Sequence, residues 1–288
     1  MANDKISRLK QEALLRRINK FLAPVPFFFI NLLILVIICF EFLLVLPYEI
    51  EVRGFYTSMA LVAGGIYIIV NIYYHLAKAA YTNPGCPRKS DEAPLCNVCD
   101  NYKPHTAHHC SICRHCVIRM DHHCLLINNC VGLHNHRHFF QFLAFLFLGC
   151  FYALLSGFYT IYYNIFMNLP QYDYCNVLAG KSELCKAAYD PLHLVFIGLA
   201  NVLLYFGMMM TGLMLVWQMY LISAGTTAVR YKKEKKHGFN WHAFDDLHIV
   251  KKNWTEFLGM EKPGQSFWRS VLIPSGHKTY YVDYEMKV

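Results

Sequence analysis

Four long apolar stretches dominate the sequence, and polar segments separate them. Each stretch is almost free of charged residues and reaches the roughly 20 residues that a helix needs to cross a bilayer. The four stretches are Phe27–Leu46, Tyr56–Leu76, Phe139–Met167 and His193–Ile222. The first is too long for the apolar part of a signal peptide, roughly 7–15 residues, so we expect it to remain as an anchor. The pattern predicts an α-helical membrane protein with four transmembrane helices.

Basic residues are distributed unevenly among the polar segments. Residues 1–26, 77–138 and 223–288 carry 24 of the 27 Lys and Arg residues, whereas residues 47–55 and 168–192 carry three. Lys and Arg accumulate on the cytoplasmic side of membrane proteins. We therefore expect both termini and the segment 77–138 to be cytosolic, and the two sparse loops to face the lumen. The net charge of +8 then lies along one membrane face, which suits anionic lipid head groups and phosphate-bearing ligands.

The remaining polar segments differ in character. Residues 1–26 mix basic and apolar side chains, as in a helix that lies at the membrane surface. The luminal loop 168–192 carries Cys175 and Cys185, and a disulfide between them is an open alternative to free thiols, since spacing alone cannot establish a bridge. Residues 223–288 begin with a basic cluster and end in an aromatic-rich region. We expect a partly ordered cytosolic C-terminal domain there, packed near the membrane surface.

The cytosolic segment 77–138 is poor in aliphatic side chains, and seven of the twelve cysteines of the chain fall between residues 96 and 130. It opens with Thr82-Asn83-Pro84-Gly85, a turn signal that redirects the chain away from the membrane. Such a segment cannot bury an ordinary core, so metal or disulfides must hold it. In a reducing cytosol, paired Cys-x2-Cys units near histidines indicate zinc. Two sites of three Cys and one His would use six of the seven cysteines and leave one thiol that is not structural.

The leftover thiol is identified by its neighbours in the run Asp121-His122-His123-Cys124. In an extended strand, His122 and Cys124 project from the same face. His122 can therefore act as a base toward Cys124, and the thiolate is the nucleophilic form of cysteine. Asp121 and His123 project from the other face, so that His123 is turned toward a metal site. Asp121 would need a local turn to orient His122, which the spacing permits.

Together these motifs resemble the cysteine-rich domain of the DHHC family of protein S-acyltransferases. The residues that match the family's spacing are Cys96, Cys99, Pro104, His108, His109, Cys110, Cys113, Cys116, Asp121, His122, His123, Cys124, Asn128, Asn129, Cys130, Val131, Gly132, Asn135 and Phe139. The four spans, the domain between the second and third spans, and the cytosolic termini match the family too. Two shorter stretches, Leu221–Gly225 and Leu272–His277, further resemble an Abl-philin-like animal subgroup.

The resemblance implies two structural zinc ions, each in a site of three cysteines and one histidine. One ligand set is Cys96, Cys99, His109 and Cys116, and the other is Cys110, Cys113, His123 and Cys130. The resemblance also implies that Cys124 is the acylated nucleophile, with His122 as its base and Asp121 as the residue that orients His122. In the tail, Asn253 matches an Asn that ties the C-terminal region back by hydrogen bonds.

Three positions depart from the family pattern. Leu125-Leu126 follow Cys124 where most members have Pro-Trp, which puts the acyl-chain preference in doubt because leucine offers apolar surface but no indole. The family's Thr-Thr-x-Glu motif after the fourth span has Val229, or Arg230 if shifted by one, in place of the acid. The chain must therefore tie its tail to the catalytic domain by other contacts, or be less active. Asn replaces the Asp of the family's turn after the second span.

The resemblance implies a palmitoyltransferase that moves a long-chain acyl group from palmitoyl-CoA, through a thioester on Cys124, to membrane-proximal cysteines of substrate proteins. Candidate contacts for the CoA phosphates are Arg119, Arg137, Lys232 and Lys233. We expect residence in the membrane of the endoplasmic reticulum or the Golgi. A zinc-containing membrane adaptor without catalytic activity is the alternative. Nucleic-acid binding is not expected, because the domain lies between spans and lacks a C₂H₂ recognition-helix pattern.

Overall fold

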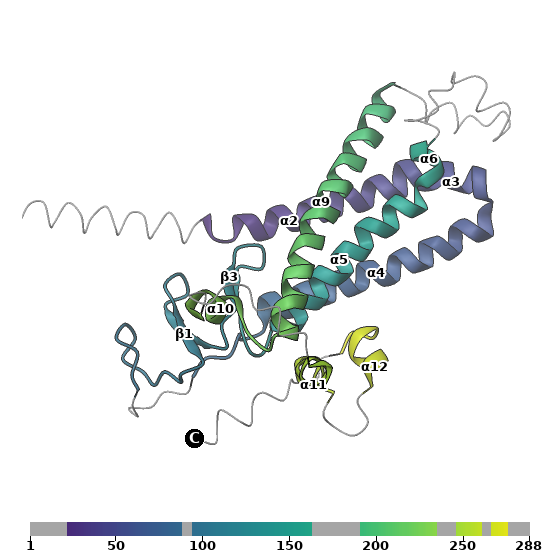
Figure 1. The fold of residues 1–288 in the computed structure, drawn as a ribbon. Helices are drawn as coiled ribbons and strands as arrows, with labels where there is room; N and C mark the ends of the chain where they lie inside the picture. The colour runs from purple at the N-terminus through teal and green to yellow at the C-terminus, as the bar shows by residue number, and fades with distance from the viewer. Residues whose placement is uncertain (1–21, 88–93, 163–190, 235–245, 261–265, 276–288) are drawn as a thin grey trace, which may run out of the picture.

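The protein is described here by a computed structural model, which covers residues 22–87, 94–162, 191–234, 246–260 and 266–275. Most of the basic N-terminal segment, the pair Cys175 and Cys185, and the C-terminal end of the tail lie outside these residues. The described part is mostly helical. Two short hairpins lie at one end of a bundle of long helices (Figure 1).

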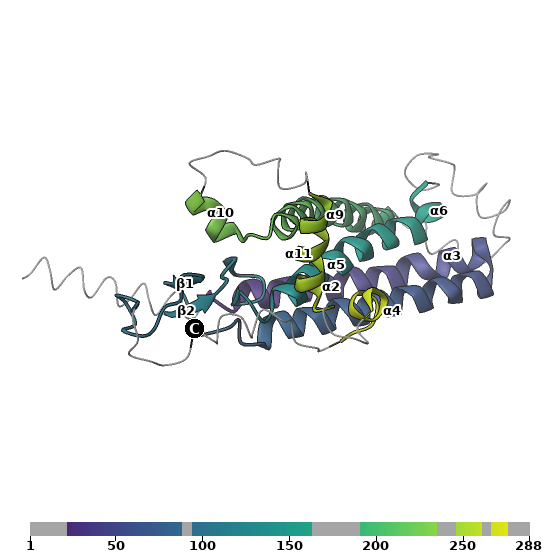
Figure 2. The ribbon, with the colours of Figure 1, turned by 60° about the horizontal axis from the view of Figure 1, so that its bottom comes forward.

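Four helices are long and apolar enough to cross a membrane, as the hydropathy pattern predicts. The first span combines α2 (Val25–Phe40) with a π-helical turn, η1 (Glu41–Val45), and is continued by α3 (Leu46–Arg53). The other spans lie in α4 (Phe55–Tyr81), α5 (His136–Ser156) and α9 (Pro191–Ser223). Because α5 packs against both α4 and α9, it occupies the centre of the bundle (Figures 1 and 2).

The predicted loop after the first span is largely helical instead. Pro47 lies in the first turn of α3, directly after the π-helical turn. The helix ends at Gly54, whose φ of +83° is readily adopted only by glycine. The Arg53 guanidinium donates to the carbonyl oxygens of Leu155 and Ser156 and so ties α3 to the end of α5.

The third span is shorter than predicted because its helix is interrupted after Ser156. The Glu49 carboxylate accepts from the backbone N–H of Thr160 at 2.9 Å and from its hydroxyl at 2.8 Å. These two bonds tie Thr160 to α3. Only a short helix, α6 (Phe158–Ile161), follows, and the predicted end at Met167 lies outside the described residues.

A small module of two antiparallel hairpins connects α4 to α5. In the module β1 (Ala107–Cys110) pairs with β2 (His115–Ile118), and β3 (His122–Cys124) pairs with β4 (Asn129–Val131). The predicted turn leads into it: the Asn83 side chain accepts from the backbone N–H of Gly85 at 2.8 Å. Asn135 ties the module back to the bundle, because its amide donates to the carbonyl oxygens of Ala79 and Cys130.

The described tail consists of three short helices, α10 (Ala228–Glu234), α11 (Leu247–Leu258) and α12 (Phe267–Val271). Figure 1 places α10 beside the hairpins and α11 near the adjacent end of α9. The Asn253 amide donates to the carbonyl oxygen of Ser223 at 2.8 Å, and the Trp254 indole donates to the Ser223 hydroxyl at 3.0 Å. Asn253 therefore makes a tie of the kind that the resemblance implies.

Candidate active site and metal centres

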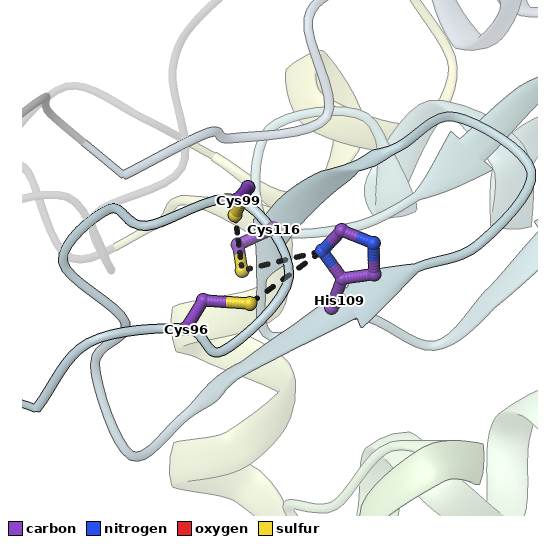
Figure 3. Close-up of side chains that lie close together, drawn as sticks. All are labelled: Cys96, Cys99, His109 and Cys116. Atoms are coloured by element: carbon purple, nitrogen blue, oxygen red, sulfur yellow. Dashed lines mark hydrogen bonds between the residues drawn. The ribbon is translucent and has the colours of Figure 1, made fainter.

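Three cysteines and one histidine converge near the start of the hairpin module (Figure 3). Cys96 and Cys99 belong to a tight turn, while His109 on β1 and Cys116 on β2 are cross-strand partners. His109 Nδ1 lies 3.6 Å from Cys96 Sγ and 4.0 Å from Cys116 Sγ. The sulfur atoms of Cys99 and Cys116 are 3.7 Å apart. This first metal group thus joins a turn to the first hairpin.

A second metal group repeats this plan further along the chain. Cys110 and Cys113 lie at the tip of the first hairpin, and His123 on β3 pairs with Cys130 on β4. His123 Nδ1 lies 3.3 Å from Cys113 Sγ, 3.5 Å from Cys130 Sγ and 3.8 Å from Cys110 Sγ. The turn that closes the first hairpin therefore also supplies two ligand atoms to the group on the second hairpin.

Both groups have the dimensions of a tetrahedral zinc site. Zn–S bonds of about 2.3 Å place tetrahedral ligand atoms roughly 3.5–3.8 Å apart. The measured separations of 3.3–4.0 Å are close to this spacing, and the four ligand atoms of each group lie within 4.8 Å of one another. The groups are the two sets that the resemblance implies, and they fit two structural zinc ions. Bound zinc would supply folding energy to a module that has little apolar core.

Asp121 and His122 form a pair beside the second metal group. Asp121 Oδ2 accepts from His122 Nδ1 at 2.8 Å, and only 1% of Asp121 is exposed. Burial opposes ionisation of this carboxyl. The hydrogen bond from His122, the nearby His136 imidazole and the backbone N–H of Ala228 outweigh burial and hold the pKa of Asp121 below its usual range. The carboxylate is therefore the stable form of Asp121.

Two further donors hold the Asp121 carboxylate from other parts of the chain. The Gln218 amide on α9 donates to Oδ2 at 2.9 Å, and the backbone N–H of Ala228 donates to Oδ1 at 2.7 Å. The Ala228 bond links the segment after the fourth span to the Asp121-His122-His123-Cys124 run, although the acid of the family's motif is missing there. Sequence reasoning missed both partners. Ala228 acts through its backbone, whereas Gln218 could have been found as a polar residue within an apolar span.

The His122 ring is oriented so that one nitrogen remains for proton transfer. Nδ1 bonds to Asp121, and the ring packs edge to face against Phe139 with centroids 5.1 Å apart. Nε2 is buried and has no hydrogen-bond partner within the described residues. Burial disfavours the charged imidazole, but Asp121 and the Cys124 thiol raise the pKa of His122 to about 9. His122 and Cys124 lie two residues apart on β3 and therefore share a strand face.

Cys124 lies where the module meets the bundle. It is 7% exposed and belongs to an apolar cluster that includes Ile34 of α2 and Ile72 of α4. These two isoleucines also line a cavity of about 140 Å³ between α2, α4 and α5. The next two residues in the sequence, Leu125 and Leu126, are 54% and 41% exposed. The thiol is thus surrounded by apolar side chains that continue toward the interior of the bundle.

Three of the four basic residues proposed as CoA contacts lie at pockets near the active site. Arg119 and Lys233 line a pocket of about 340 Å³ between the module and α10, together with Arg230. Lys232 lines a pocket of about 320 Å³ to which Asp121 and His122 also contribute, so it is the basic side chain that shares a pocket with the catalytic run.

Arg137 has a different environment from the other three. Only 1% of it is exposed, and its guanidinium donates to the carbonyl oxygens of Leu258, at the end of α11, and of Ser275. A side chain buried in this way holds the tail and does not present its charge to a phosphate at the surface. The bias of basic residues toward the cytosol, on which the prediction rests, does not distinguish exposed from buried positions.

Comparisons with known proteins agree with this geometry. The family model described as DHHC palmitoyltransferase matches residues 89–235. Palmitoyltransferase ZDHHC16A of Danio rerio is 27% identical over 259 residues, which cover 75% of this chain and 65% of the relative. Palmitoyltransferase ZDHHC16 of Bos taurus is 30% identical over 235 residues, covering 73% of this chain and 60% of the relative. Palmitoyltransferase PFA4 of Debaryomyces hansenii is 32% identical over 207 residues, covering 69% and 48%.

The matches show the family to which the chain belongs and how much of each relative the chain covers. The chain spans 65% or less of the length of these three relatives. The two ZDHHC16 proteins agree with the Abl-philin-like resemblance of the tail. The match to the family model begins before the first metal group and ends just after α10, and so includes both hairpins and the Asp121-His122-His123-Cys124 run. On these grounds the chain belongs to the DHHC palmitoyltransferase family.

Proposed function

We propose that the protein is a protein S-acyltransferase that transfers a long-chain acyl group from acyl-CoA to protein cysteines. One observation carries the proposal. Of the seven cysteines between residues 96 and 130, only Cys124 stands outside the two metal groups, and it lies beside an imidazole held by a buried carboxylate. A thiol in such a setting is activated as a nucleophile, whereas metal-bound thiolates are occupied.

In the first step Cys124 Sγ attacks the carbonyl carbon of the acyl thioester. A carbon–sulfur bond forms to Cys124, and the bond from that carbon to the CoA sulfur breaks. His122 Nε2 accepts the proton of Cys124 and returns it to the CoA thiolate. Asp121 keeps Nδ1 of His122 protonated and hydrogen-bonded, so that Nε2 is the nitrogen that exchanges this proton.

In the second step the acceptor thiol takes the place of Cys124. Its sulfur bonds to the acyl carbon, the bond to Cys124 breaks, and His122 carries the proton from the acceptor to Cys124. No oxidant or metal-bound intermediate is required, because one thioester is exchanged for another. Zinc has a structural role in this scheme, since all four ligands of each group come from the protein.

The surroundings of Cys124 suit an acyl-CoA donor. The acyl chain would lie among the apolar side chains that lead to the cavity between α2, α4 and α5. The CoA phosphates would meet Lys232, Arg119 and Lys233 at the two pockets beside α10. Acceptors would be proteins whose cysteines lie close to the membrane, because the buried thiol is at the end of the bundle.

The orientation in the membrane follows from the positive-inside bias. We infer that the termini, the hairpin module and the tail are cytosolic, where acyl-CoA is available and thiols are reduced. We place the protein in the endomembrane system, in the endoplasmic reticulum or the Golgi. The segments 1–26, 77–138 and 223–288 then act as an N-terminal surface segment, a catalytic domain and a C-terminal domain on the same side.

The proposal is tested by intact-mass spectrometry of the purified protein after incubation with palmitoyl-CoA. We expect one added palmitoyl group that neutral hydroxylamine removes, and we expect it to be absent from Cys124→Ser. Cys86→Ser is the matched control, because Cys86 is an exposed thiol near the membrane that belongs to neither metal group. A folded, zinc-loaded wild type without an adduct would refute the proposal and leave a non-catalytic adaptor as the better reading.

A further inference from the structure

A chain of buried hydrogen bonds connects the catalytic run to the helical bundle through a single amide. Gln218 on α9 is 1% exposed, and its Nε2 donates to Asp121 Oδ2 at 2.9 Å. Its Oε1 lies 2.8 Å from His136 Nε2, on the first residue of α5. One side chain thus bridges the hairpin module, α5 and α9, which come from three separate parts of the sequence.

The direction of these hydrogen bonds is determined by the chemistry of the groups. The Gln218 amide nitrogen faces Asp121 Oδ2 and can only donate, so this carboxylate oxygen is the acceptor. The Gln218 carbonyl oxygen must then face His136 and can only accept, which requires a proton on His136 Nε2. No other orientation of the amide satisfies both neighbours. The amide therefore holds the two groups in one defined arrangement.

Burial of the Gln218 amide is energetically unfavourable unless its polar atoms form hydrogen bonds. Gln218 lies in α9, within a span from Val195 to Ser223 whose other side chains are mostly apolar. A polar side chain buried in such a helix is unfavourable without hydrogen-bond partners and often marks a functional position. The partners of Gln218 are the catalytic carboxylate and a histidine, not the backbone of its own helix.

Resting on the function proposed above, we infer that Gln218 is a positioning residue for the acyl transfer. Oδ2 of Asp121 accepts from both Gln218 and His122, while Oδ1 accepts from Ala228. The Gln218 bond stops the carboxylate from rotating away from His122, and thereby keeps His122 aligned with Cys124. The hydrogen-bond partners of Gln218 are Asp121 and His136, not Cys124, so we place its effect on the acyl transfer at Asp121.

The test compares Gln218→Met with a matched control on the same helix. Methionine has a similar length but cannot donate. The control is Asn201→Leu, which removes another buried α9 amide, one that donates only to Ile197 within its own helix. We expect the rate constant of thioester formation at saturating palmitoyl-CoA to fall about 10- to 100-fold in Gln218→Met. The KM for palmitoyl-CoA should stay within about threefold, and Asn201→Leu should match the wild type.

Zinc content and the thermal midpoint decide whether a loss of rate reflects positioning or misfolding. Two zinc ions per chain and an unchanged midpoint in Gln218→Met would support positioning. If Gln218→Met loses zinc, Gln218→Leu is used instead, because leucine is smaller than methionine and likewise cannot donate to Asp121. A slower rate is again expected. A wild-type rate in the folded variant would overturn the inference.

A double-mutant cycle shows whether Gln218 acts through Asp121. If it does, adding Gln218→Met to Asp121→Ala should change the rate less than about twofold, since the group that it positions is already gone. If the fold-changes in rate of the two single variants instead multiply in the double variant, Gln218 does not act through Asp121 and the inference is contradicted. The two proposals fail separately: no thioester on the wild type refutes the acyltransferase, whereas a thioester with equal rates in wild type and Gln218→Met refutes only the positioning role.

Discussion

The two metal groups share the same ligand types and the same local plan, yet they differ in what they support. Each joins a Cys-x2-Cys turn to a cross-strand His and Cys pair. In the first group the turn, Cys96 to Cys99, precedes both hairpins. In the second group the turn is the tip of the first hairpin, and His123 stands between the two active residues of β3.

The second group is also the more deeply integrated of the two. Cys110 and Cys130 pack in a buried cluster with Val117 and Met120, and Val229 after the fourth span packs against it. Loss of this group would release the strand that carries Cys124, whereas loss of the first would release a turn ahead of it. We therefore expect the second metal group to hold the proposed catalytic strand directly, and the first group to stabilise the turn that precedes it.

Removal of a ligand from the second group should have the largest effect. In Cys130→Ala we expect thioester formation to fall below about 1% of the wild-type rate, because His123 and the catalytic strand lose their anchor. Zinc should fall from two ions per chain to one or fewer. Atomic emission on the purified protein and the rate of hydroxylamine-labile labelling measure both quantities. A variant that keeps two zinc ions would show that Cys130 is not a ligand.

Removal of a ligand from the first group should be less severe. In Cys99→Ala we expect one zinc ion to be lost and thioester formation to slow by about 10-fold, since the second hairpin keeps its own metal. The same two assays apply, at a temperature below the thermal midpoint of the variant. If Cys99→Ala and Cys130→Ala abolish activity equally, the contrast between the two groups is wrong.

A smaller loss is expected when the second hairpin is detached from α4 without touching the metal. The Asn129 amide donates to the carbonyl oxygens of Ala80 and Thr82, both at 3.0 Å. In Asn129→Leu these carbonyls lose their donor, so the free energy of unfolding should fall by about 1–3 kcal/mol. Both zinc ions should remain. Denaturation in detergent measures the first expectation, and a variant as stable as the wild type would show that the tie contributes little.

The smallest effects should come from the exposed apolar residues inside the two Cys-x2-Cys turns. Val98 and Ile112 occupy the same position in their turns and are 71% and 59% exposed. Val98→Ser and Ile112→Ser should each change the free energy of unfolding by less than about 0.5 kcal/mol and leave thioester formation unchanged. A loss of stability or of thioester formation in only one of the two variants would mean that its turn makes a functional contact outside the described residues.

The sequence was most informative where chemistry is encoded by short spacing. The ligand types of both metal groups, the leftover Cys124 and the turn at Asn83 all depend on residues close together in the chain, and the structure brings each set together. The four spans were predictable for a similar reason, because a run of apolar residues and the thickness of a bilayer determine them.

Contacts between distant segments could not be predicted in this way. Gln218 meets Asp121 across 97 residues, and Arg137 meets Ser275 across 138. Glu49 meets Thr160, just beyond the end of the third span, across 111 residues. Such pairs leave no periodic or motif signal, since a single hydrogen bond constrains only two positions. These contacts can be identified only once the packing of the helices is known.

Native mass spectrometry of the purified protein after palmitoyl-CoA treatment shows whether zinc and the acyl group are present on the same molecule. We predict a single species that carries two zinc ions and one palmitoyl group, with the palmitoyl group lost in Cys124→Ser and the zinc ions retained. This result would establish that eight residues bind metal while the ninth, Cys124, carries the acyl group. A palmitoyl group that appears only on molecules lacking zinc would contradict the account, because a metal ligand would then be the acylated residue.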